Sequence, residues 1–426
     1  MKVKIEPGAV SGIVDAIPSK SHLHRLLICA ALADQSTKIL CQHTGAEDIE
    51  ATVACLEALG AQIIVLVDGF DIKPINTDKI PEHAVLPVNE SGSTLRFLLP
   101  VVAALGITAT FEMKGRLPER PLYPLDNQLM NKGITLTRPS ADTLLVTGQL
   151  QFGNYTLPGN ISSQYISGLL MALPLLKRDS SLKITGNIES VDYITLTTDV
   201  QREFGVEHFD NEQMYMINGS KNYRSPQVIH VDGDWSNGAF WLACGAMPGC
   251  SVTLTKMNQN SLQGDRRIID ILSQLGATIG WQENQVTVTA DQRQAVDIDA
   301  SGIPDLIPVV AAVLSVAEGT SRITNAGRLR IKESDRLNTT AATLNALGAK
   351  VTELEDGLII EGVSNLKGGT VDTYNDHRIA MCAAVASLAC TEPVMITGAE
   401  AVNKSYPQLW ADFAKLGGII DVDLEK

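Results

Sequence analysis

The chain has 426 residues, of which 45% are hydrophobic and 19% are charged, and this composition is typical of a folded globular protein with two or three domains. Its formal net charge of −14 excludes nucleic acid as the main partner, because phosphate backbones select basic surfaces. The seven cysteines show no CxxC spacing and lie mostly in apolar segments, which predicts reduced, buried thiols and a cytoplasmic location.

No segment of the sequence predicts a signal peptide or a membrane-spanning helix. Residues 1–12 read as a strand and a turn, not as a signal peptide. The longest uncharged apolar stretch, 97–111, contains Pro100 and Gly106 and is too short to span a bilayer comfortably. We therefore expect no membrane partner.

Six times along the chain, a segment with helical periodicity runs into a glycine and then into an extended apolar stretch. The glycines are Gly60, Gly133, Gly205, Gly276, Gly348 and Gly417, and successive positions differ by 73, 72, 71, 72 and 69 residues. In the fifth unit, the spacing predicts a helix over 335–347, which Gly348 ends in the left-handed conformation. Residues 350–361 are then predicted to be extended, with a turn at Asp356–Gly357.

A second helix is predicted roughly midway between these glycines, and it is apolar nearly all round, as interior helices are. The six helices are expected to begin at Ser21, Ser93, Ser163, Ser236, Asp305 and Asp376, all of which are suited to capping a helix N-terminus. Six buried helices are too many for one core. The sequence therefore predicts two domains of three βαβ-type units each, with the helix N-termini facing a shared cleft.

Basic and polar residues gather at these predicted helix starts. The residues concerned are Lys20, Ser21, Arg25, Gly92, Ser93, Arg96, Arg116, Arg120, Ser162, Ser163, Gln164, Ser190, Tyr193, Arg328, Lys332, Arg336, Asp376, His377, Arg378 and Lys404. Helix N-termini offer unpaired N–H groups, and lysine and arginine add full positive charges. Although one such residue is usually a solvated surface charge, recurrence in the same slot of several units favours a site for anionic small molecules.

Two carboxylates stand out in this setting. Asp305 starts an otherwise apolar helix, and Glu333 lies inside a basic run, so either could act as a general acid or base. Simpler interpretations remain open: Asp305 as a helix cap, Lys332–Glu333 as a surface ion pair, and His377 as a cap of its own helix. The chain has no CxxC, HExxH, Walker A or GxGxxG motif, so we expect neither a metal nor a cofactor.

The motifs resemble one known family in order and spacing. They are PSKS followed by Arg25, SGST with Arg96, RLPERP, SSQ, IPD, KESDR, YNDHR and NKSYP. Together they are similar to EPSP synthases (3-phosphoshikimate 1-carboxyvinyltransferases), over essentially the whole chain. The resemblance implies a two-domain inside-out α/β barrel built from six βαβαββ repeats, three per domain. The implied domains are residues 20–231, mainly for phosphoshikimate, and 1–19 plus 232–426, with the active site in the cleft between them.

The resemblance also implies an activity and a role for each matching residue. The enolpyruvyl group of phosphoenolpyruvate would pass to the 5-hydroxyl of shikimate 3-phosphate by addition and elimination, in an enzyme that acts as a monomer. Shikimate 3-phosphate would be bound by Lys20, Ser21, Arg25, Ser162, Ser163, Gln164, Ser190, Asp305, Arg328 and Lys332. Phosphoenolpyruvate would be bound by Lys20, Gly92, Arg116, Gln164, Arg336, Arg378 and Lys404. The catalytic residues would be Asp305, Glu333, Lys20, His377 and Lys404.

Several positions differ from the usual pattern of the family or bear on inhibition. Glu90 and Arg328 each stand where an asparagine is common. Gly92 is retained at the position where a larger residue is associated with resistance to glyphosate, so we expect glyphosate to compete with phosphoenolpyruvate.

The fourth unit, around Gly276, contains GDRR at 264–267 but no match to a family contact, and it is expected to be mainly structural.

Two other functions are considered. UDP-N-acetylglucosamine 1-carboxyvinyltransferases share the implied fold and chemistry, but they commonly carry a cysteine in the loop that corresponds to 115–121. No cysteine occurs here between Cys55 and Cys244. A non-catalytic binder of phosphorylated metabolites would be expected to have lost a carboxylate, whereas Asp305 and Glu333 are both present.

Overall fold

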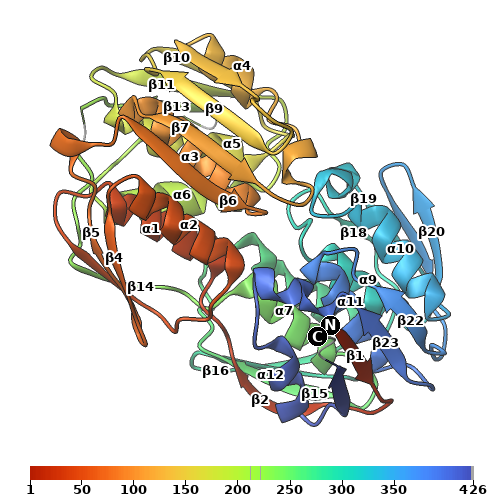
Figure 1. Cartoon of the computed structure of the whole chain (residues 1–426). Helices are drawn as coiled ribbons and strands as arrows, with labels where there is room; N and C mark the ends of the chain where they lie inside the picture. The colour runs from red at the N-terminus through yellow and green to blue at the C-terminus, as the bar shows by residue number, and fades with distance from the viewer. Residues whose placement is uncertain (212, 221, 424–426) are drawn as a thin grey trace. The chain divides into compact units, whose positions relative to one another are not determined.

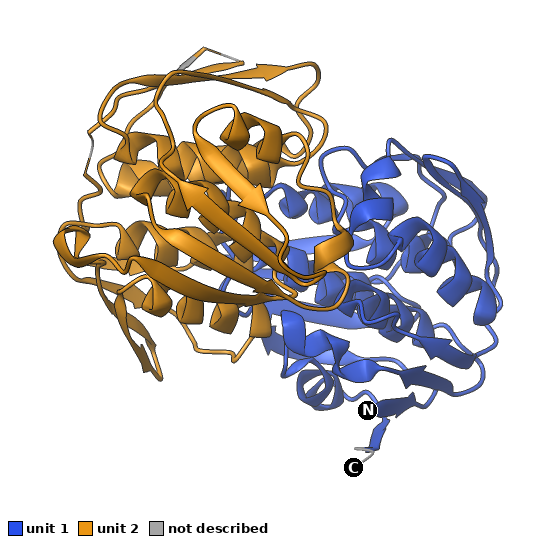
Figure 2. Cartoon of the chain, turned by 45° about the horizontal axis from the view of Figure 1, so that its top comes forward, with its two compact units in different colours: residues 1–19, 232–426 blue, residues 20–231 orange. Residues whose placement is uncertain are grey.

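The structure is a computed structural model that describes residues 1–211, 213–220 and 222–423. The chain divides into two compact units, shown in different colours in Figure 2. The continuous unit comprises Lys20–Val231, and the split unit comprises Met1–Ser19 with Asp232–Lys426. Both units mix helices with sheets that contain parallel and antiparallel strands, so the predicted α/β class is confirmed.

Every four-stranded sheet in the described residues follows the same pairing scheme. In one of them, β6 (His83–Asn89) runs parallel to β7 (Thr108–Met113), which is antiparallel to β9 (Thr143–Gly148), with β8 (Ile134–Thr137) antiparallel at the edge. The helix α3 (Gly92–Leu105) connects the parallel pair, as parallel strands require, and Figure 1 shows it behind this sheet. A second helix, α4 (Leu125–Met130), precedes the hairpin of β8 and β9.

The same scheme recurs twice more in the continuous unit. The strands of these sheets, in spatial order, are β14 (Val228–His230), β3 (Thr37–Leu40), β5 (Gly69–Lys73) and β4 (Gln62–Leu66), and then β10 (Asn154–Pro158), β11 (Ser180–Thr185), β13 (Met214–Ile217) and β12 (Phe209–Asn211). In each sheet the first pair is parallel and the next two pairs are antiparallel.

The split unit contains the other three sheets. They are formed by β2 (Ser11–Asp15), β15 (Ser251–Thr255), β17 (Gln285–Thr289) and β16 (Thr278–Gln282); by β18 (Ile298–Asp299), β19 (Thr320–Thr324), β21 (Gly357–Glu361) and β20 (Lys350–Leu354); and by β22 (Gly369–Asp372), β23 (Val394–Thr397), β1 (Lys2–Ile5) and β24 (Ile420–Asp423). The N-terminal residues therefore supply one strand to each of two different sheets.

The apolar helices predicted from the sequence lie in the interiors of the two units. They are α1 (Lys20–Ala31), α3 and α5 (Ser163–Ala172) in the continuous unit, and α7 (Trp235–Gly245), α9 (Ile307–Leu314) and α11 (His377–Ser387) in the split unit. Nearly all their residues are buried, because an all-apolar helix has no face suited to water. Each unit has its own hydrophobic core, built around its three interior helices.

The predicted helix starts at Ser21, Ser93 and Ser236 lie one residue inside their helices, which begin at Lys20, Gly92 and Trp235. The side chains that cap α3, α5 and α7 are those of Ser91, Ser162 and Asp234.

The start predicted at Asp305 is wrong. The helix α9 begins at Ile307, and Asp305 precedes it within a turn that is closed by the bond from the Leu306 N–H to the Ile303 carbonyl. Pro308 occupies the first turn, where its missing N–H costs no helical bond, and no side chain caps this end. The Asp305 carboxylate therefore does not cap the helix.

The predicted glycine-ended helices are confirmed. They are α2 (Glu47–Ala58), α4, α6 (Val191–Glu203), α8 (Ile268–Leu275), α10 (Arg336–Ala346) and α12 (Leu409–Lys415). The six glycines that follow them all have positive φ, between 72° and 104°. This is the left-handed conformation, which ends a helix and which a side chain disfavours. The turn predicted at Asp356–Gly357 lies one residue earlier, because Glu355 and Asp356 join β20 to β21 and Gly357 is already the first residue of β21.

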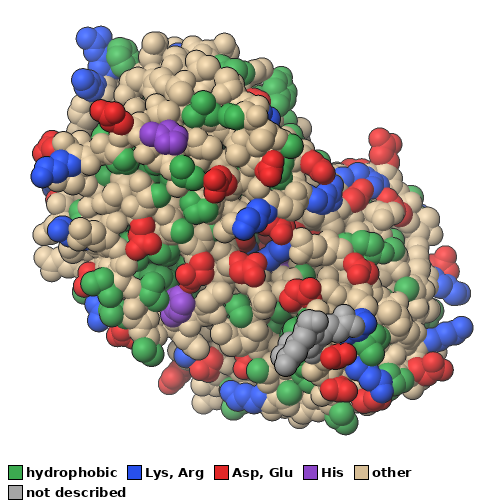
Figure 3. All heavy atoms as spheres, in the orientation of Figure 1, with side chains coloured by type: hydrophobic (Ala, Val, Ile, Leu, Met, Phe, Trp, Pro, Cys, Tyr) green, Lys and Arg blue, Asp and Glu red, His purple; other side chains and the backbone are tan. Residues whose placement is uncertain are grey.

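Acidic and basic side chains are interspersed on the surface. The face in Figure 3 shows aspartate and glutamate beside lysine and arginine over both units, without one extended basic patch on that face. Among the described residues, none of the helices is both long enough and apolar enough to span a bilayer.

Candidate active site

A group of ionised side chains in the split unit centres on Arg336. We call Asp305, Lys332, Glu333, Arg336 and Asp376 the carboxylate–arginine cluster. The Arg336 side chain is 1% exposed, and its guanidinium donates to Asp305 Oδ1 at 2.6 Å, to Glu333 Oε2 at 2.7 Å and to Asp376 Oδ2 at 2.8 Å. Lys332 Nζ lies 3.2 Å from Asp305 Oδ1. One buried cation is thus shared among three carboxylates.

Helix ends place this cluster. Arg336 is the first residue of α10, whose N-cap Asp335 accepts the Asn338 N–H. Asp376 is the N-cap of α11 and accepts the Arg378 N–H at 2.9 Å, while it also receives the Ser334 hydroxyl at 2.8 Å. The cap interpretation of this end is therefore correct for Asp376, but the same carboxylate also holds Arg336.

The cluster rules out a simple surface pair between Lys332 and Glu333. Lys332 is joined to Asp305 and Glu333 to Arg336, and both side chains are mostly shielded from water. Burial alone would raise the pKa of Asp305, but Lys332, Arg336 and Arg378 outweigh it and hold that pKa well below its ordinary value. Asp305 is thus firmly ionised in the ligand-free chain, and it would become more basic if its cations were shared with another anion.

Burial lowers the pKa of Lys332, and the attraction of Asp305 only partly restores it. For Arg336, burial also favours the neutral form, but Asp376, Glu333 and Asp305 outweigh it and raise the pKa, so this guanidinium remains charged at any accessible pH. The cluster thus offers an ionised carboxylate beside a lysine that gives up its proton more readily than usual. A carboxylate that can accept a proton and a lysine that can donate one could together transfer protons to and from a substrate held between them.

Two further predicted cations come from the segments around α11. Arg378 is buried, and its Nη1 donates to the Ser236 carbonyl at 2.5 Å. Its Nε is buried without a hydrogen-bond partner in the described part of the chain, so it can still donate to an anionic ligand. Lys404 is also buried and donates to the Asn375 carbonyl at 2.6 Å. His377 Nδ1 lies 3.8 Å from Asp376 Oδ1, at the edge of the cluster.

The continuous unit holds a second set of predicted residues. Lys20 Nζ is 2.6 Å from Asp48 Oδ2, and both side chains are mostly buried. Arg25 lies one helical turn further along α1 and donates to the Thr197 hydroxyl at 2.7 Å, to the Tyr193 carbonyl at 2.9 Å and to the Ser21 carbonyl at 2.6 Å. Burial lowers the pKa of Arg25 to about 10. These contacts join the starts of α1 and α6.

The start of α3 forms the centre of this second set. Gln164 accepts a bond from Arg96 Nη1 at 2.7 Å and donates to the Ser93 hydroxyl at 2.9 Å. A Cβ atom placed on Gly92 would lie 2.8 Å from Nη1 of Arg120 and 2.9 Å from Nη1 of Arg96. Two guanidinium groups therefore approach the backbone of Gly92 so closely that a side chain at this position would displace them.

The predicted serines also lie at helix starts. Ser162 caps α5 by accepting the Gln164 N–H at 3.3 Å, and Ser163 is the first residue of that helix. Ser190 precedes α6 with a φ of 53° and makes no side-chain cap bond there. These helix N-termini add partial positive charge to that of Lys20, Arg25 and the arginines near Gly92.

Two predicted residues are less firmly integrated. The Arg116 side chain is 48% exposed, and its Nε lies 3.8 Å from Oε2 of Glu119. Arg328 lies close enough to Lys332 to contribute to the lowering of its pKa.

Sequence reasoning did not find Asp48, and it placed Arg96, Arg120 and Asp376 at helix starts without assigning them to either substrate. Asp48 is 28 residues from Lys20 and lies on the next helix, so helical periodicity could not link them. Arg96 and Arg120 were visible as cations at helix starts, but their convergence on Gly92 depends on the fold.

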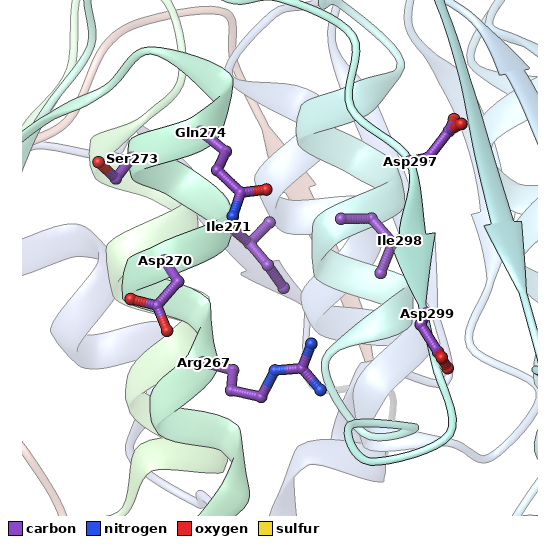
Figure 4. Close-up of a pocket in the computed structure, with 8 residues that line it drawn as sticks. All are labelled: Arg267, Asp270, Ile271, Ser273, Gln274, Asp297, Ile298 and Asp299. Carbon is purple, nitrogen blue, oxygen red and sulfur yellow. The ribbon is translucent and has the colours of Figure 1, made fainter.

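A surface pocket of about 400 Å³ lies elsewhere in the split unit, between α8 and β18. Figure 4 shows Arg267 extending into the space between Asp270 on the helix and Asp299 on the strand. None of the residues predicted from the sequence lines this pocket. Among the described residues, no group of three or more His, Cys, Asp or Glu side chains could hold a metal ion.

The fold and the two sets of charged side chains point to one class, the enolpyruvyl transferases. Across 99% of both chains, the fold matches that of the solved EPSP synthase from Acinetobacter baumannii, with a TM-score of 0.82 and 25% identity. It also matches the fold of the enolpyruvyl transferase NikO from Streptomyces tendae, with a TM-score of 0.78 and 18% identity.

Sequence comparison identifies the family within this class. The family model described as EPSP synthase (3-phosphoshikimate 1-carboxyvinyltransferase) matches residues 5–413. Proteins named 3-phosphoshikimate 1-carboxyvinyltransferase from Clostridium kluyveri and Clostridium acetobutylicum are 44% and 42% identical to the chain, over 98% of its length and 98% and 97% of theirs. The chain belongs to the EPSP synthase family, as its motifs predicted.

Proposed function

We propose that this chain transfers the enolpyruvyl group of phosphoenolpyruvate to the 5-hydroxyl of shikimate 3-phosphate, on the route to chorismate and the aromatic amino acids. The observation that carries the proposal is the carboxylate–arginine cluster. Arg336 and Lys332 hold the Asp305 and Glu333 carboxylates in one partly buried group, where a substrate anion can take over the cations. Family membership supplies the identity of the substrates.

Each step of the reaction has a candidate residue. Asp305 accepts the proton of the 5-hydroxyl, and the oxygen adds to C2 of phosphoenolpyruvate. Glu333, Lys20 or Lys404 protonates C3, which gives a tetrahedral adduct. The adduct loses its C3 proton together with inorganic phosphate, and the enolpyruvyl ether remains. Cations around both substrates stabilise the charge on the departing phosphate.

The low pKa of Asp305 in the ligand-free chain is compatible with this role. Phosphoenolpyruvate carries a carboxylate and a phosphate, and both would compete with Asp305 and Glu333 for Arg336 and Arg378. Asp305 would then lose part of the attraction that lowers its pKa and become a stronger base when the substrate is in place. His377, at the edge of the cluster, remains a proposed participant.

Two overlapping sets of residues are proposed to bind the substrates. Shikimate 3-phosphate would be bound by Lys20, Ser21, Arg25, Ser162, Ser163, Gln164, Ser190, Asp305, Arg328 and Lys332. Phosphoenolpyruvate would be bound by Lys20, Gly92, Arg116, Gln164, Arg336, Arg378 and Lys404. We also propose that the six sheets, with their identical pairing schemes, are six βαβαββ repeats of a two-domain inside-out barrel, and that the enzyme is a cytoplasmic monomer.

The decisive experiment measures phosphate release from phosphoenolpyruvate with two acceptors in turn. Release with shikimate 3-phosphate, but not with UDP-N-acetylglucosamine, is the expected result. Release with the sugar nucleotide alone would assign the chain to the other enolpyruvyl transfer reaction. Binding of phosphoenolpyruvate without release in either reaction would make the chain a binder of phosphorylated metabolites.

A further inference from the structure

We propose that Asp265 is a positioning residue for phosphoenolpyruvate, and that it acts through Ser236 to fix the guanidinium of Arg378. The inference rests on the proposed function, because it assigns Arg378 to the phosphoenolpyruvate subsite. It concerns the fourth glycine unit, for which the sequence predicted only a structural role. The contacts that carry it all lie within the split unit.

Ser236 joins the other two residues by two different atoms. Its hydroxyl donates to Oδ2 of Asp265, a fully buried carboxylate in the short 3₁₀ helix Gly264–Arg267. Its backbone carbonyl accepts Nη1 of Arg378 at 2.5 Å. A shift of Ser236 would therefore move the acceptor that orients the guanidinium. The Nε of Arg378 is buried, and among the described residues it has no hydrogen-bond acceptor. The orientation of the guanidinium therefore decides where this N–H group can donate to an anion.

The carboxylate of Asp265 is not needed to cap α7. Asp234 already does this by accepting the Asn237 N–H at 2.6 Å. Gln263 further fixes the entry to the helix, because its Oε1 accepts the Trp235 N–H at 3.0 Å and its Nε2 donates to the Gly233 carbonyl at 2.8 Å. A buried carboxylate is costly to keep, so its retention beside an end that is already capped indicates a task other than helix formation.

The first turn of α7 also touches the other proposed phosphoenolpyruvate segment. Asn237 Oδ1 accepts the Ser405 hydroxyl at 3.2 Å, and Ser405 directly follows Lys404. One helical turn is thus bonded both to Arg378 and to the neighbour of Lys404. The fourth unit would supply no ligand of its own, but would set the spacing of two cations that bind the same substrate.

The inference predicts a selective effect on one substrate. Asp265→Asn preserves the size of the side chain but removes the charge that holds the Ser236 hydroxyl. We expect KM for phosphoenolpyruvate to rise about tenfold, as is typical when a hydrogen bond to a charged group is lost. KM for shikimate 3-phosphate should change by no more than about twofold to threefold, and kcat should fall only modestly. Ser236→Ala should act in the same way, since it removes the same bond from the other side.

The experiment compares steady-state kinetics of the full chain and its variants with both substrates. Asp270→Asn is the matched control, because Asp270 is an exposed carboxylate on the next helix (Figure 4) and should leave both KM values unchanged. Arg378→Lys provides a second test. If Asp265 acts through Arg378, adding Asp265→Asn to Arg378→Lys should raise KM for phosphoenolpyruvate by much less than the change in the parent chain. If Asp265→Asn does not fold, Ser236→Ala decides alone.

Two outcomes would overturn the inference. One is a KM for phosphoenolpyruvate that stays at the parent value in folded Asp265→Asn and Ser236→Ala. The other is a loss of thermal stability accompanied by equal changes in both KM values, which would indicate a purely structural role. Failure of the unaltered chain to release phosphate with shikimate 3-phosphate would instead refute the proposed function, so the two failures are distinguishable.

Discussion

At the residue scale, the candidate site is organised by charge balance around Arg336. A guanidinium that is 1% exposed would be strongly destabilising without partners, and it is offset here by Asp305, Glu333 and Asp376. The same arrangement holds Asp305 and Glu333, the two proposed catalytic carboxylates, against Arg336, and it keeps Asp305 ionised. The cluster therefore links the stability of the split unit to its chemistry.

Replacing either catalytic carboxylate should impair turnover far more than binding. Asp305→Asn and Glu333→Gln remove a proton acceptor or donor but keep the shape, so we expect kcat to fall by at least about 100-fold. Both KM values should change by less than tenfold, because the binding cations remain. Steady-state kinetics with both substrates checks this. Near-normal kcat in either variant would show that the altered carboxylate is not catalytic.

His24 predicts a dependence of stability on pH in the acidic range. Burial lowers its pKa well below the ordinary 6.5, and the positive charges of Lys20 and Arg25 lower it further. The unfolded chain therefore binds more protons than the folded chain below pH 6.5. Stability is fully present above that pH and falls as the pH is lowered, by up to about 1.4 kcal/mol per pH unit, until folded His24 itself takes up a proton.

His24→Gln should reduce this loss, because glutamine does not titrate and its amide can replace the ring nitrogen that lies 2.8 Å from the Thr52 hydroxyl. Urea unfolding at pH 6.5 and pH 5 provides the measurement. Part of the dependence should remain, since burial also lowers the pKa of His208, to about 4. His83→Gln, at an exposed position, is the control. An unchanged difference between the two pH values in His24→Gln would contradict the expectation.

At the element scale, helix starts position the site and glycines end the other helices. The convergence of Arg96 and Arg120 on Gly92 gives a direct test of the first role. In Gly92→Ala, the new methyl group would lie under 3 Å from both guanidinium groups and must displace them. We expect KM for phosphoenolpyruvate to rise about tenfold, since small displacements of positioning groups are costly. Inhibition by glyphosate should weaken with it.

The control for this variant is Gly280→Ala, because a methyl group at Gly280 would meet no atom within 4 Å. It should leave both KM values and the inhibition by glyphosate unchanged. A Gly92→Ala protein with the parent KM for phosphoenolpyruvate would show that the two arginines do not serve this substrate.

The helix-ending glycines allow backbone strain to be separated from crowding. Gly417 has a φ of 97° with no atom within 4 Å of an added Cβ, whereas at Gly276, with a φ of 102°, the Cβ would lie 2.6 Å from the Gln292 carbonyl oxygen. Gly417→Ala should therefore cost only the left-handed conformation, about 1–2 kcal/mol. Gly276→Ala should cost clearly more. Thermal unfolding of the two variants checks this order, and equal losses would contradict it.

The elements were largely predictable from the sequence, and the reasons are local. Gly348 and the apolar spacing before it define α10 by helical periodicity and left-handed glycine chemistry alone. The helix start is the exception, because α9 begins at Ile307 with Pro308 in its first turn, although Asp305 is the better capping residue. The sequence also identified the lysines and arginines of the site, but not their contacts. The bond between Lys20 and Asp48 and the bridge from Asp265 to Arg378 depend on packing between helices, which no local pattern encodes.

At the scale of the whole molecule, the two units differ in how the chain builds them. The core of the continuous unit and all three of its sheets are formed by residues between Leu23 and His230. The split unit depends on the first 19 residues, because β1 lies between β23 and β24, and β2 pairs with β15. The continuous unit therefore has the contacts of an independent domain, whereas the split unit requires both ends of its sequence.

We accordingly expect a fragment comprising residues 20–231 to fold on its own and to unfold cooperatively in urea. Because Arg25 and the serines of α5 and α6 all belong to it, the fragment should bind shikimate 3-phosphate, and Arg25→Lys should weaken that binding, since lysine cannot reproduce the bonds of the guanidinium. It should release no phosphate from phosphoenolpyruvate, because Asp305 and Glu333 are absent. Calorimetric titration measures the binding. An unfolded fragment would show that the continuous unit needs the rest of the chain, whereas a folded fragment without affinity for shikimate 3-phosphate would place that substrate's main contacts in the split unit.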